Sequence, residues 1–273
     1  MLLKLGLFPP TPPKDINDQL HLQVPDFGLG ESQSNRTEPA AMKATWLGHA
    51  CFLLELAAPT GSERGPRILF DPVFVHRCSP FQFMGPGRYT GRPNSFTKHP
   101  VMTVPVSYED PPCKLEDIPS VDIVVISHNH YDHLDTTSIS TLDRLHHPHF
   151  FAPLGNGASF KSLGIPAERT HIMDWWETRD VAVEGKETHA SFKIICTPSQ
   201  HFTGRGVFDR FKTLWASWAV VDDHTGAKAW FGGDTAYRTV REGDNEDDVP
   251  FCPEFQNIGN KLGPFDLAMI PIG

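Results

Sequence analysis

The sequence lacks closely spaced cysteines, long apolar runs and an excess of positive charge. Its five cysteines are widely spaced and form no Cys-x-x-Cys motif, which argues against a disulfide framework and a cysteine-type zinc finger. No run approaches the roughly 20 consecutive apolar residues of a membrane-spanning helix, so no transmembrane segment is expected. There are 24 Lys and Arg against 33 Asp and Glu, and the net charge of −9 argues against a nucleic-acid partner. These absences favour a cytoplasmic protein with reduced thiols.

The residues that are present predict a globular domain. Hydrophobic residues make up 39% of the 273 positions, enough for a sizeable core, and charged residues are only 21%, too few for a disordered polyelectrolyte. Residues 1–40 are rich in proline and polar residues and predict a flexible or loosely docked tail. Prolines from Pro9 onward interrupt its short apolar start, so no signal peptide is expected. Residues 41–273 predict one domain.

Short apolar, β-branched segments predict a series of strands with helices among them. Two strands joined by a glycine turn are expected between residues 44 and 55. Further strands are expected at residues 67–70, 121–127, 150–153, 170–174, 191–197, 214–221, 228–231 and 265–273, with helices at 136–145 and between residues 153 and 170. This alternation predicts an α/β fold. Loops at its strand ends repeatedly carry His or Asp, and such loops are where α/β proteins place their chemistry.

Histidine is abundant, with 14 in the chain, and the densest cluster follows the most apolar predicted strand. The sequence there reads His128-x-His130-x-Asp132-His133. Imidazole nitrogen and carboxylate oxygen are ligands suited to zinc and related divalent metals. One metal could take His128 and His130, and a neighbouring metal Asp132 and His133. The alternatives are a polar loop in which histidines cluster by chance and a helix N-terminus that Asp132 caps.

Two later residues follow predicted strands in a similar way. His201 stands where a third histidine ligand of the first metal would be expected, although an ordinary surface histidine fits the same pattern. Asp234 follows two glycines, so its carboxylate could approach two cations closely and bridge them. Alone, an aspartate in this position is typical of a turn or a helix N-cap.

Several segments of the chain resemble a known family. Three segments resemble motifs of the metallo-β-lactamase superfamily: HNHYDHLD, TPSQH and FGGDT. Other segments resemble one branch of this superfamily, the N-acyl-phosphatidylethanolamine-hydrolysing phospholipase D and its bacterial and fungal relatives. These segments are WLGHACFLLE, LFDPVF, SPFQFMGPGR, DWWE, TLWASW and GPFDLAMIPIG. The resemblance runs from Thr45 to Gly273, and these flanking segments are more specific than the histidine motif alone.

The resemblance implies a fold and a metal centre. The fold would be a four-layer αββα sandwich with the site at one edge, between its two sheets. The resemblance implies two Zn²⁺ ions. His128, His130 and His201 would hold one of them, Asp132 and His133 would hold the other, and Asp234 would bridge the two. His49 would lie near this site, with either a direct or a purely structural role.

The resemblance also implies a reaction and its partners. The reaction would be phosphodiester hydrolysis, in which Asp132 and Asp234 orient the nucleophile as catalytic residues, and its products would be phosphatidic acid and an N-acylethanolamine. Gln82 and Phe83 would bind substrate, unless their apolar loop is an ordinary turn packed on the core. The expected partner is a phospholipid at a membrane surface that the protein contacts peripherally, and a homodimer is left open.

The chain departs from the family pattern at its C-terminal end. In the family a further zinc-ligating histidine and a terminal strand follow the segment that ends this sequence. The C-terminal strands or helices are therefore expected to be missing, and the second metal to have an incomplete ligand set. Two other hypotheses stay open: another hydrolase of the superfamily, such as a lactonase, thioesterase or nuclease, and a metal-binding remnant with impaired catalysis. Residues 94–112 and 236–250 are expected to be insertions.

Overall fold

Two β-sheets face each other in the structure, a computed structural model that describes residues 25–27, 42–75, 77, 111–204 and 209–271. The first sheet contains, in spatial order, β1 (Lys43–Trp46), β2 (Phe52–Glu55), β3 (Arg67–Phe70), β4 (Ile123–Val125), β5 (His149–Pro153) and β6 (Thr170–Met173). The second sheet contains β11 (Leu267–Met269), β10 (Lys228–Phe231), β9 (Ser217–Asp222), β8 (His189–Thr197) and β7 (Thr178–Glu184).

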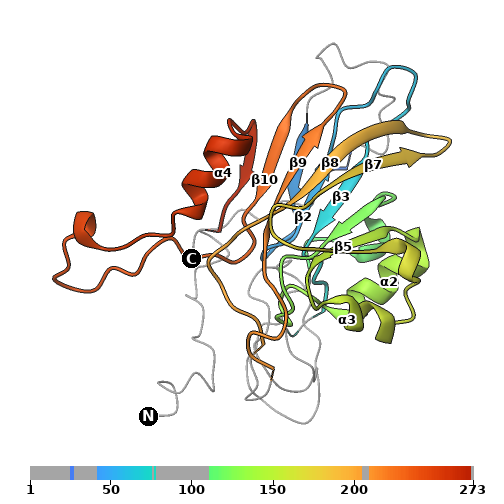
Figure 1. Ribbon diagram of the computed structural model, residues 1–273. Coiled ribbons are helices and arrows are strands. Elements are labelled where there is room, and N and C mark those ends of the chain that lie inside the picture. The colour runs from blue at the N-terminus through green and yellow to red at the C-terminus, as the bar shows by residue number, and fades with distance from the viewer. Residues whose placement is uncertain (1–24, 28–41, 76, 78–110, 205–208, 272–273) are drawn as a thin grey trace, which may run out of the picture.

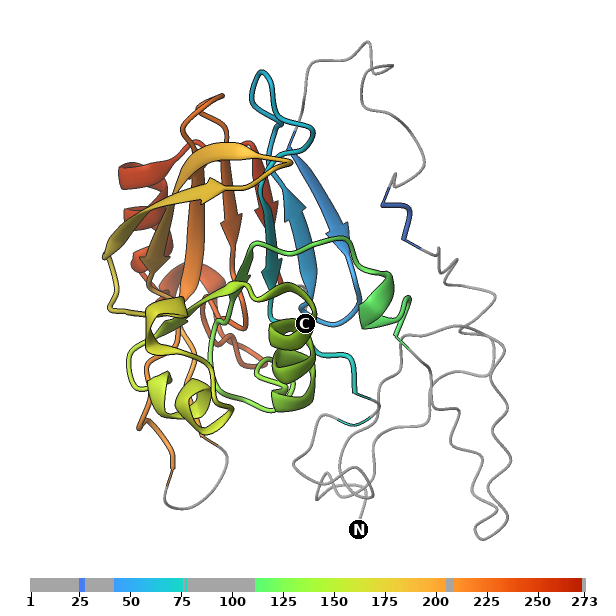
Figure 2. The ribbon, with the colours of Figure 1, turned by 90° about the vertical axis from the view of Figure 1, so that its right-hand side faces the viewer.

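Helices cover the outer faces of both sheets. The described helices are α2 (Thr136–His146), α3 (Gly157–Ser162) and α4 (Glu254–Leu262), with short 3₁₀ helices η3 (Leu115–Asp117), η4 (Ala167–Arg169) and η5 (Glu246–Asp248). Figure 1 shows α2 and α3 on one side of the paired sheets and α4 on the other. In Figure 2, turned by 90°, α2 and α3 lie in front of the strands. The layers therefore follow the order helix, sheet, sheet, helix, which is the predicted αββα sandwich.

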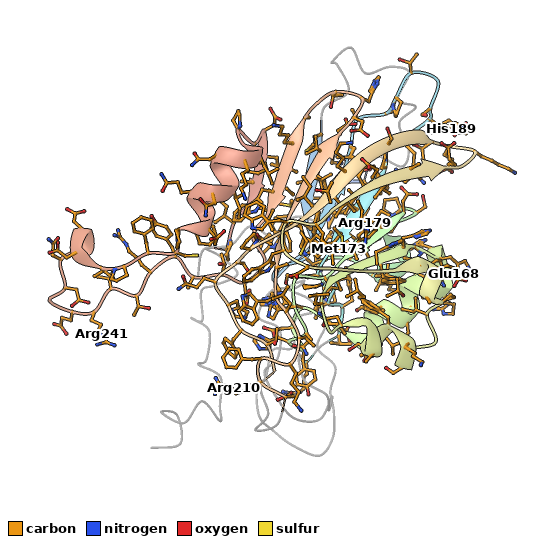
Figure 3. The ribbon with its side chains drawn as sticks, viewed as in Figure 1. Glu168, Met173, Arg179, His189, Arg210 and Arg241 are labelled. Atoms are coloured by element: carbon orange, nitrogen blue, oxygen red, sulfur yellow. The ribbon has the colours of Figure 1, made fainter. Side chains whose placement is uncertain are left out.

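Alternating side chains explain why the first sheet is apolar on both faces. In β4, Val124 belongs to the core cluster beneath α2, whereas Ile123 and Val125 belong to the cluster between the sheets. A third cluster lies between the second sheet and α4. Figure 3 shows the contrast with the surface, because Met173 lies among packed side chains and His189 lies at the periphery. The nearly continuous apolar strand in the sequence thus reflects burial on both faces.

The strand ends that carry the polar motifs meet at one edge of the sandwich. β3 pairs in parallel with β4, so Asp71 and Ser127, which follow these strands, lie side by side. The two sheets are joined at the same edge. The Ala216 amide donates to the Ser127 carbonyl over 2.9 Å. Trp218 Nε1 donates to the Ile126 carbonyl over 3.1 Å, so the loops after β4 and β8 come together.

Most predicted elements occur close to their expected bounds. β3 and β10 coincide with the strands predicted at 67–70 and 228–231, and α2 ends at His146 rather than at residue 145. The strand predicted at 121–127 is shorter, because regular pairing in β4 covers only Ile123–Val125. The sequence did not predict β7 or α4.

Some predictions concern residues that the structure does not describe. All of the expected tail except residues 25–27, and the loop that holds Gln82 and Phe83, lie outside the described residues. Within the tail, Phe27 packs against the core cluster beneath α2. In the described part of the chain, no helix combines the length and the apolar character that crossing a membrane requires.

Candidate metal centre

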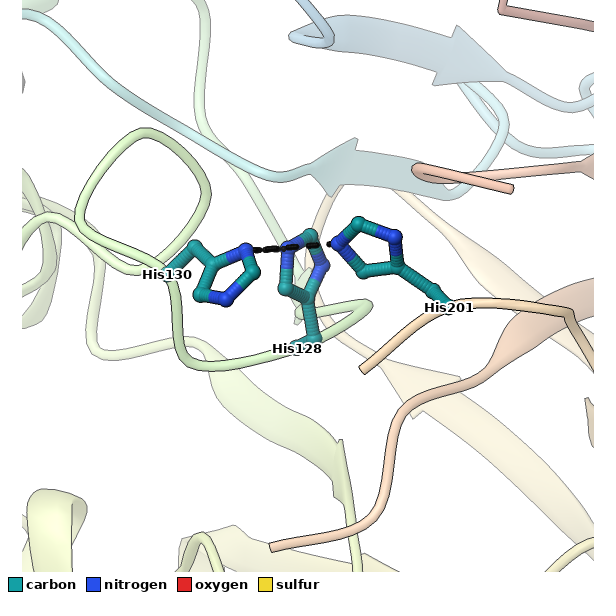
Figure 4. Close-up of side chains that lie close together, drawn as sticks. All are labelled: His128, His130 and His201. Carbon is teal, nitrogen blue, oxygen red and sulfur yellow. Dashed lines mark hydrogen bonds between the residues drawn. The ribbon is translucent and has the colours of Figure 1, made fainter. Parts of the chain in front are cut away.

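Three histidines form the first part of the site (Figure 4). His128 and His130 lie on the loop that follows β4, and His201 lies on the loop that follows β8. His128 Nε2 is 2.8 Å from His130 Nδ1, and His201 Nε2 is 3.3 Å from the same Nδ1 atom. His128 and His130 are buried, and His201 is half-buried. The structure therefore brings together the three residues that the sequence predicted as one ligand group.

Two carboxylates and two histidines form a second part beside it. His133 Nε2 lies 3.2 Å from Asp234 Oδ1 and 3.9 Å from Asp132 Oδ2. His49 Nε2 lies 3.3 Å from Asp132 Oδ2. On the other side of Asp234, His201 Nε2 lies 3.8 Å from Oδ2. Asp234 thus directs one carboxylate oxygen toward each group of histidines.

The chemistry of these donors fits a pair of zinc-type divalent ions. Imidazole nitrogen and carboxylate oxygen are ligands that zinc accepts. Nitrogens at a zinc distance of about 2.0–2.1 Å in a tetrahedral shell stand roughly 3.3 Å apart. The separations of 2.8, 3.2, 3.3, 3.8 and 3.9 Å in this site surround that value. His128 and His133 each belong to two overlapping groups of donors, so the site is continuous.

A buried aspartate that the sequence analysis did not single out supports this loop. Asp71 follows β3 and accepts the Ser127 amide over 2.7 Å and the Ser127 hydroxyl over 2.6 Å. It also lies 2.7 Å from His133 Nδ1. Because a carboxylate can only accept, this Nδ1 carries the hydrogen, and Nε2 is the atom that His133 offers to a metal. The Ser127 hydroxyl is in turn 2.9 Å from His128 Nδ1, so Asp71 supports both histidines.

The carboxylates around His133 favour its protonated form. Burial opposes that charge, but hydrogen bonds to Asp234 and Asp71 outweigh burial and raise the pKa of His133 to about 10. Burial also opposes the charged form of Asp234, yet the hydrogen bond and charge of His133 hold the pKa of this carboxyl below its ordinary value. Positive charge is therefore stabilised at this point, and a metal ion at His133 Nε2 would take the place of a proton.

A glycine lets Asp234 come this close to the loop after β4. Gly233 has a φ of +58°, in the left-handed region that glycine adopts most easily. A Cβ atom at this position would lie only 2.6 Å from the Cβ of Ser127. Any larger residue would push the loop after β10 away from the histidines. This is the close approach that the two glycines led us to expect.

Comparison with known proteins places this geometry in a family. The family model described as "Beta-lactamase superfamily domain" matches residues 66–273, which include every strand after β2. The chain belongs to the metallo-β-lactamase superfamily. Its two sheets with flanking helices form the sandwich fold of a metallo-β-lactamase, as the sequence predicted.

Several curated proteins are similar to this chain over most of its length. The N-acyl-phosphatidylethanolamine-hydrolyzing phospholipase D 1 of Caenorhabditis elegans is 37% identical over 234 residues, covering 84% of this chain and 53% of that protein. The mitochondrial enzyme of the same description from Saccharomyces cerevisiae is 28% identical over 226 residues, covering 81% and 39%. An uncharacterized protein of Mycobacterium tuberculosis is 36% identical over 238 residues, covering 87% and 50%. The chain thus spans about half or less of each relative.

The sequence motifs of this chain contain the side chains that meet at the candidate site. Overlapping donor groups contain all six residues predicted as ligands: His128, His130, Asp132, His133, His201 and Asp234. His49 joins them through Asp132. Asp71 was missed, although it follows a predicted strand just as the other site residues do. The predicted substrate residues Gln82 and Phe83 lie outside the described part of the chain.

Proposed function

We propose that the chain is a zinc-dependent phosphodiester hydrolase that converts N-acyl-phosphatidylethanolamine into phosphatidic acid and an N-acylethanolamine. Its membership of the metallo-β-lactamase superfamily supports a metal-dependent hydrolase. Relatives described as N-acyl-phosphatidylethanolamine-hydrolyzing phospholipases D support the phospholipid substrate. Because the chain spans only 53% of the Caenorhabditis elegans relative, the proposal rests on the site as well as on similarity.

The position of Asp234 between two donor groups carries this proposal. Its Oδ1 faces His133 over 3.2 Å, and its Oδ2 faces His201 over 3.8 Å. A carboxylate placed in this way can bridge two metal ions, and paired metal ions occur in many enzymes that cleave phosphate esters. In this assignment His128, His130 and His201 would hold one zinc, Asp132 and His133 would hold the other, and Asp234 would reach both.

The residues of the site would divide the work of hydrolysis among themselves. When bound, the paired zinc ions would lower the pKa of water and neutralise the charge that develops on the phosphoryl oxygens. Asp132 would accept a proton from the attacking water, and Asp132 and Asp234 together would orient the water oxygen toward phosphorus. His49, at 3.3 Å from Asp132 Oδ2, would hold that carboxylate in place. The new bond joins water oxygen to phosphorus, the bond to the ethanolamine oxygen breaks, and this oxygen takes up the proton.

Hydrolysis of N-acyl-phosphatidylethanolamine by the zinc-loaded chain tests the proposal. We expect mass spectrometry to detect both products. A chelator should abolish their formation, and added zinc should restore it. His128→Ala should release no measurable product, because one histidine donor is removed. His189→Ala is the matched control, since this exposed histidine begins β8 at the end opposite the site, and its activity should be unchanged.

Two other outcomes would contradict the proposal. Hydrolysis of a lactone, a thioester or a nucleic acid, with none of N-acyl-phosphatidylethanolamine, would assign the chain to another hydrolase of the superfamily. Less than one zinc per chain, together with no hydrolysis of any of these substrates, would identify a remnant without catalytic function.

A further inference from the structure

Four consecutive exposed residues, 209–212, lie near the candidate metal centre, and the three after Asp209 form what we call the 210–212 segment: Arg210, Phe211 and Lys212. Phe211 leaves 63% of its surface exposed to solvent. Leu154, which is 43% exposed, belongs to a loop attached to the same region, because its carbonyl accepts the Leu214 amide over 2.8 Å. Two adjoining loops thus carry two cations, one acid (Asp209) and two exposed apolar side chains, on a chain whose net charge is −9.

Aromatic rings connect the 210–212 segment with the metal centre. The ring centroid of Phe202 lies 4.9 Å from those of His130 and His201. The Arg210 guanidinium carbon lies 5.4 Å from the ring centroid of Phe202 and 5.9 Å from that of Phe211, within the range of cation–π attraction. This unbroken series of contacts places the segment at the rim of the site.

Phe211 exposes its ring from a strained backbone. Its φ is 57°, in the left-handed region that bulky residues rarely adopt. Its amide donates to the Thr203 carbonyl over 2.9 Å, and the Thr203 hydroxyl donates to the Thr213 carbonyl over 2.6 Å, so the loop is held on both sides. A mostly exposed ring gives the fold little burial energy in return for this strain. Strain of this kind is typical of segments with a functional contact.

We propose that the 210–212 segment, together with Leu154, is the surface that docks on a phospholipid bilayer. Phe211 enters the interface, and Arg210 and Lys212 contact lipid phosphates. Apolar and basic side chains in this combination are what peripheral proteins present to anionic lipid surfaces. Arg210 lies at the opposite end of the molecule from His189 (Figure 3), so docking here brings the edge with the metal centre to the membrane. The inference rests on the proposed function, which supplies the lipid substrate.

Sedimentation of the full chain with vesicles of phosphatidylcholine and phosphatidylserine tests the role of Phe211. Phe211→Asn should weaken sedimentation about tenfold, the change expected when one interfacial aromatic is lost. Its melting temperature should stay equal or rise, because asparagine adopts the left-handed region more readily. Phe251→Asn is the matched control, since Phe251 is 48% exposed in another loop, and it should sediment like the unchanged chain.

Two results would overturn this role of Phe211. One is normal sedimentation of the Phe211→Asn chain. The other is a lowered melting temperature of the Phe211→Asn chain, since the ring would then serve the fold rather than the membrane.

The basic residues are tested by replacing Arg210 and Lys212 together with alanine. Sedimentation should weaken about 25-fold at low salt, from the contribution expected of two cations at an anionic surface. The difference from the unchanged chain should shrink at high salt, which screens these charges. Arg241→Ala is the control, because Arg241 is exposed on a different loop (Figure 3). Equal weakening in the control and the double variant would overturn the proposal.

Failure of the docking surface can be told apart from failure of the proposed function. His128→Ala should sediment like the unchanged chain and release no N-acylethanolamine. If the unchanged chain sediments through the 210–212 segment without releasing product, the proposed function fails and the docking surface stands. If it releases product and Phe211→Asn leaves sedimentation unchanged, the docking surface fails and the proposed function stands.

Discussion

Asp71 accepts hydrogen bonds from the Ser127 amide, the Ser127 hydroxyl and His133 Nδ1, all at the loop that carries the candidate ligands. All three residues are buried, so water does not readily replace the carboxylate as acceptor. Partners behind a ligand fix the orientation of its ring and the nitrogen it presents. Asp71 therefore sets the geometry of the site without facing a metal itself.

Asp71→Asn should lower the affinity of the chain for zinc about 10- to 100-fold. The amide group turns an NH₂ toward donors that need an acceptor, so the ring of His133 loses its fixed orientation. Zinc competition against a chelating dye measures the effect. Asp180→Asn, on the exposed face of β7 beside Lys193, is the control. Equal zinc affinity of Asp71→Asn and the unchanged chain would show that His133 keeps its orientation without this carboxylate.

Four of the six candidate ligands were predictable because they lie close together in the sequence. His128, His130, Asp132 and His133 fall within six residues after one strand, so any fold that ends the strand there brings them together. Asp71 stands 62 positions from His133, and only the parallel pairing of β3 with β4 makes them neighbours. No local pattern contains that pairing.

At the scale of elements, the turn after β10 depends on glycine. Gly233→Ala should reduce zinc affinity, because the new Cβ would meet Ser127 at 2.6 Å and displace Asp234. Gly226→Ala is the matched control: its φ is also positive, at +75°, but nothing lies within 4 Å of an added Cβ. Both variants bear similar backbone strain, on the order of 1–2 kcal/mol, and the collision adds a further loss only in Gly233→Ala, so urea unfolding should show the larger loss of stability in that variant. Loss of zinc affinity in both would mean that strain, not collision, moves Asp234.

β5 and β6 carry two histidines that oppose folding in acid. His149 Nδ1 lies 2.9 Å from His171 Nε2, and the rings are stacked. Burial, with the charge of Arg169, lowers the pKa of His149, and burial, with His149, lowers the pKa of His171. As the pH falls below the ordinary histidine pKa of 6.5, the unfolded chain therefore binds protons at these two residues more readily than the folded chain does. Stability from these residues is present above pH 6.5 and declines as the pH falls below it.

The free energy of unfolding should therefore fall less steeply with acid when His171 is replaced by glutamine. Urea unfolding on both sides of pH 6.5 measures the difference. His224→Gln, in the exposed turn between β9 and β10, is the control. The same pH dependence in His171→Gln and the unchanged chain would show that this pair does not oppose acid unfolding.

The two elements that the sequence did not predict are weak patterns for physical reasons. In β7 the inward residues Val181 and Val183 alternate with exposed charged or small residues. This sequence pattern is typical of a polar surface segment rather than of a buried strand. In α4, Gly259 disfavours helix formation within the segment, and Ile258 is its one buried residue. Packing on the second sheet, rather than local preference, forms both. The central strands β3 and β4 were found because every residue in them is buried, which makes them largely apolar.

At the scale of the whole molecule, a second junction joins the sheets at the end away from the metal centre. Arg64, in the loop between β2 and β3, donates to both carboxylate oxygens of Asp122 over 2.6 and 2.8 Å. Its Nε donates to Glu187 over 2.8 Å, in the hairpin between β7 and β8. Arg64 and Asp122 are each nearly buried, so this arginine connects the two sheets with little screening by water.

Arg64→Ala should lower the free energy of unfolding by about 3 kcal/mol, because it leaves the nearly buried Asp122 carboxylate without its main partner. Urea unfolding of the metal-free chain measures this without interference from ligand binding. Lys193→Ala is the control, since Lys193 pairs with Asp180 in solvent and its loss should change little. A stability equal to that of the unchanged chain would show that core packing alone joins the sheets.

The candidate ligands come from both sheets, and His130 and His201 are 71 positions apart. A chain that has formed only the first sheet offers the loop after β4 but neither His201 nor Asp234. Closing so long a connection is a late and slow event in folding. Only the fully folded chain would then bind metal tightly. In a zinc-starved cell, more of this protein would remain in open forms that proteases can cut.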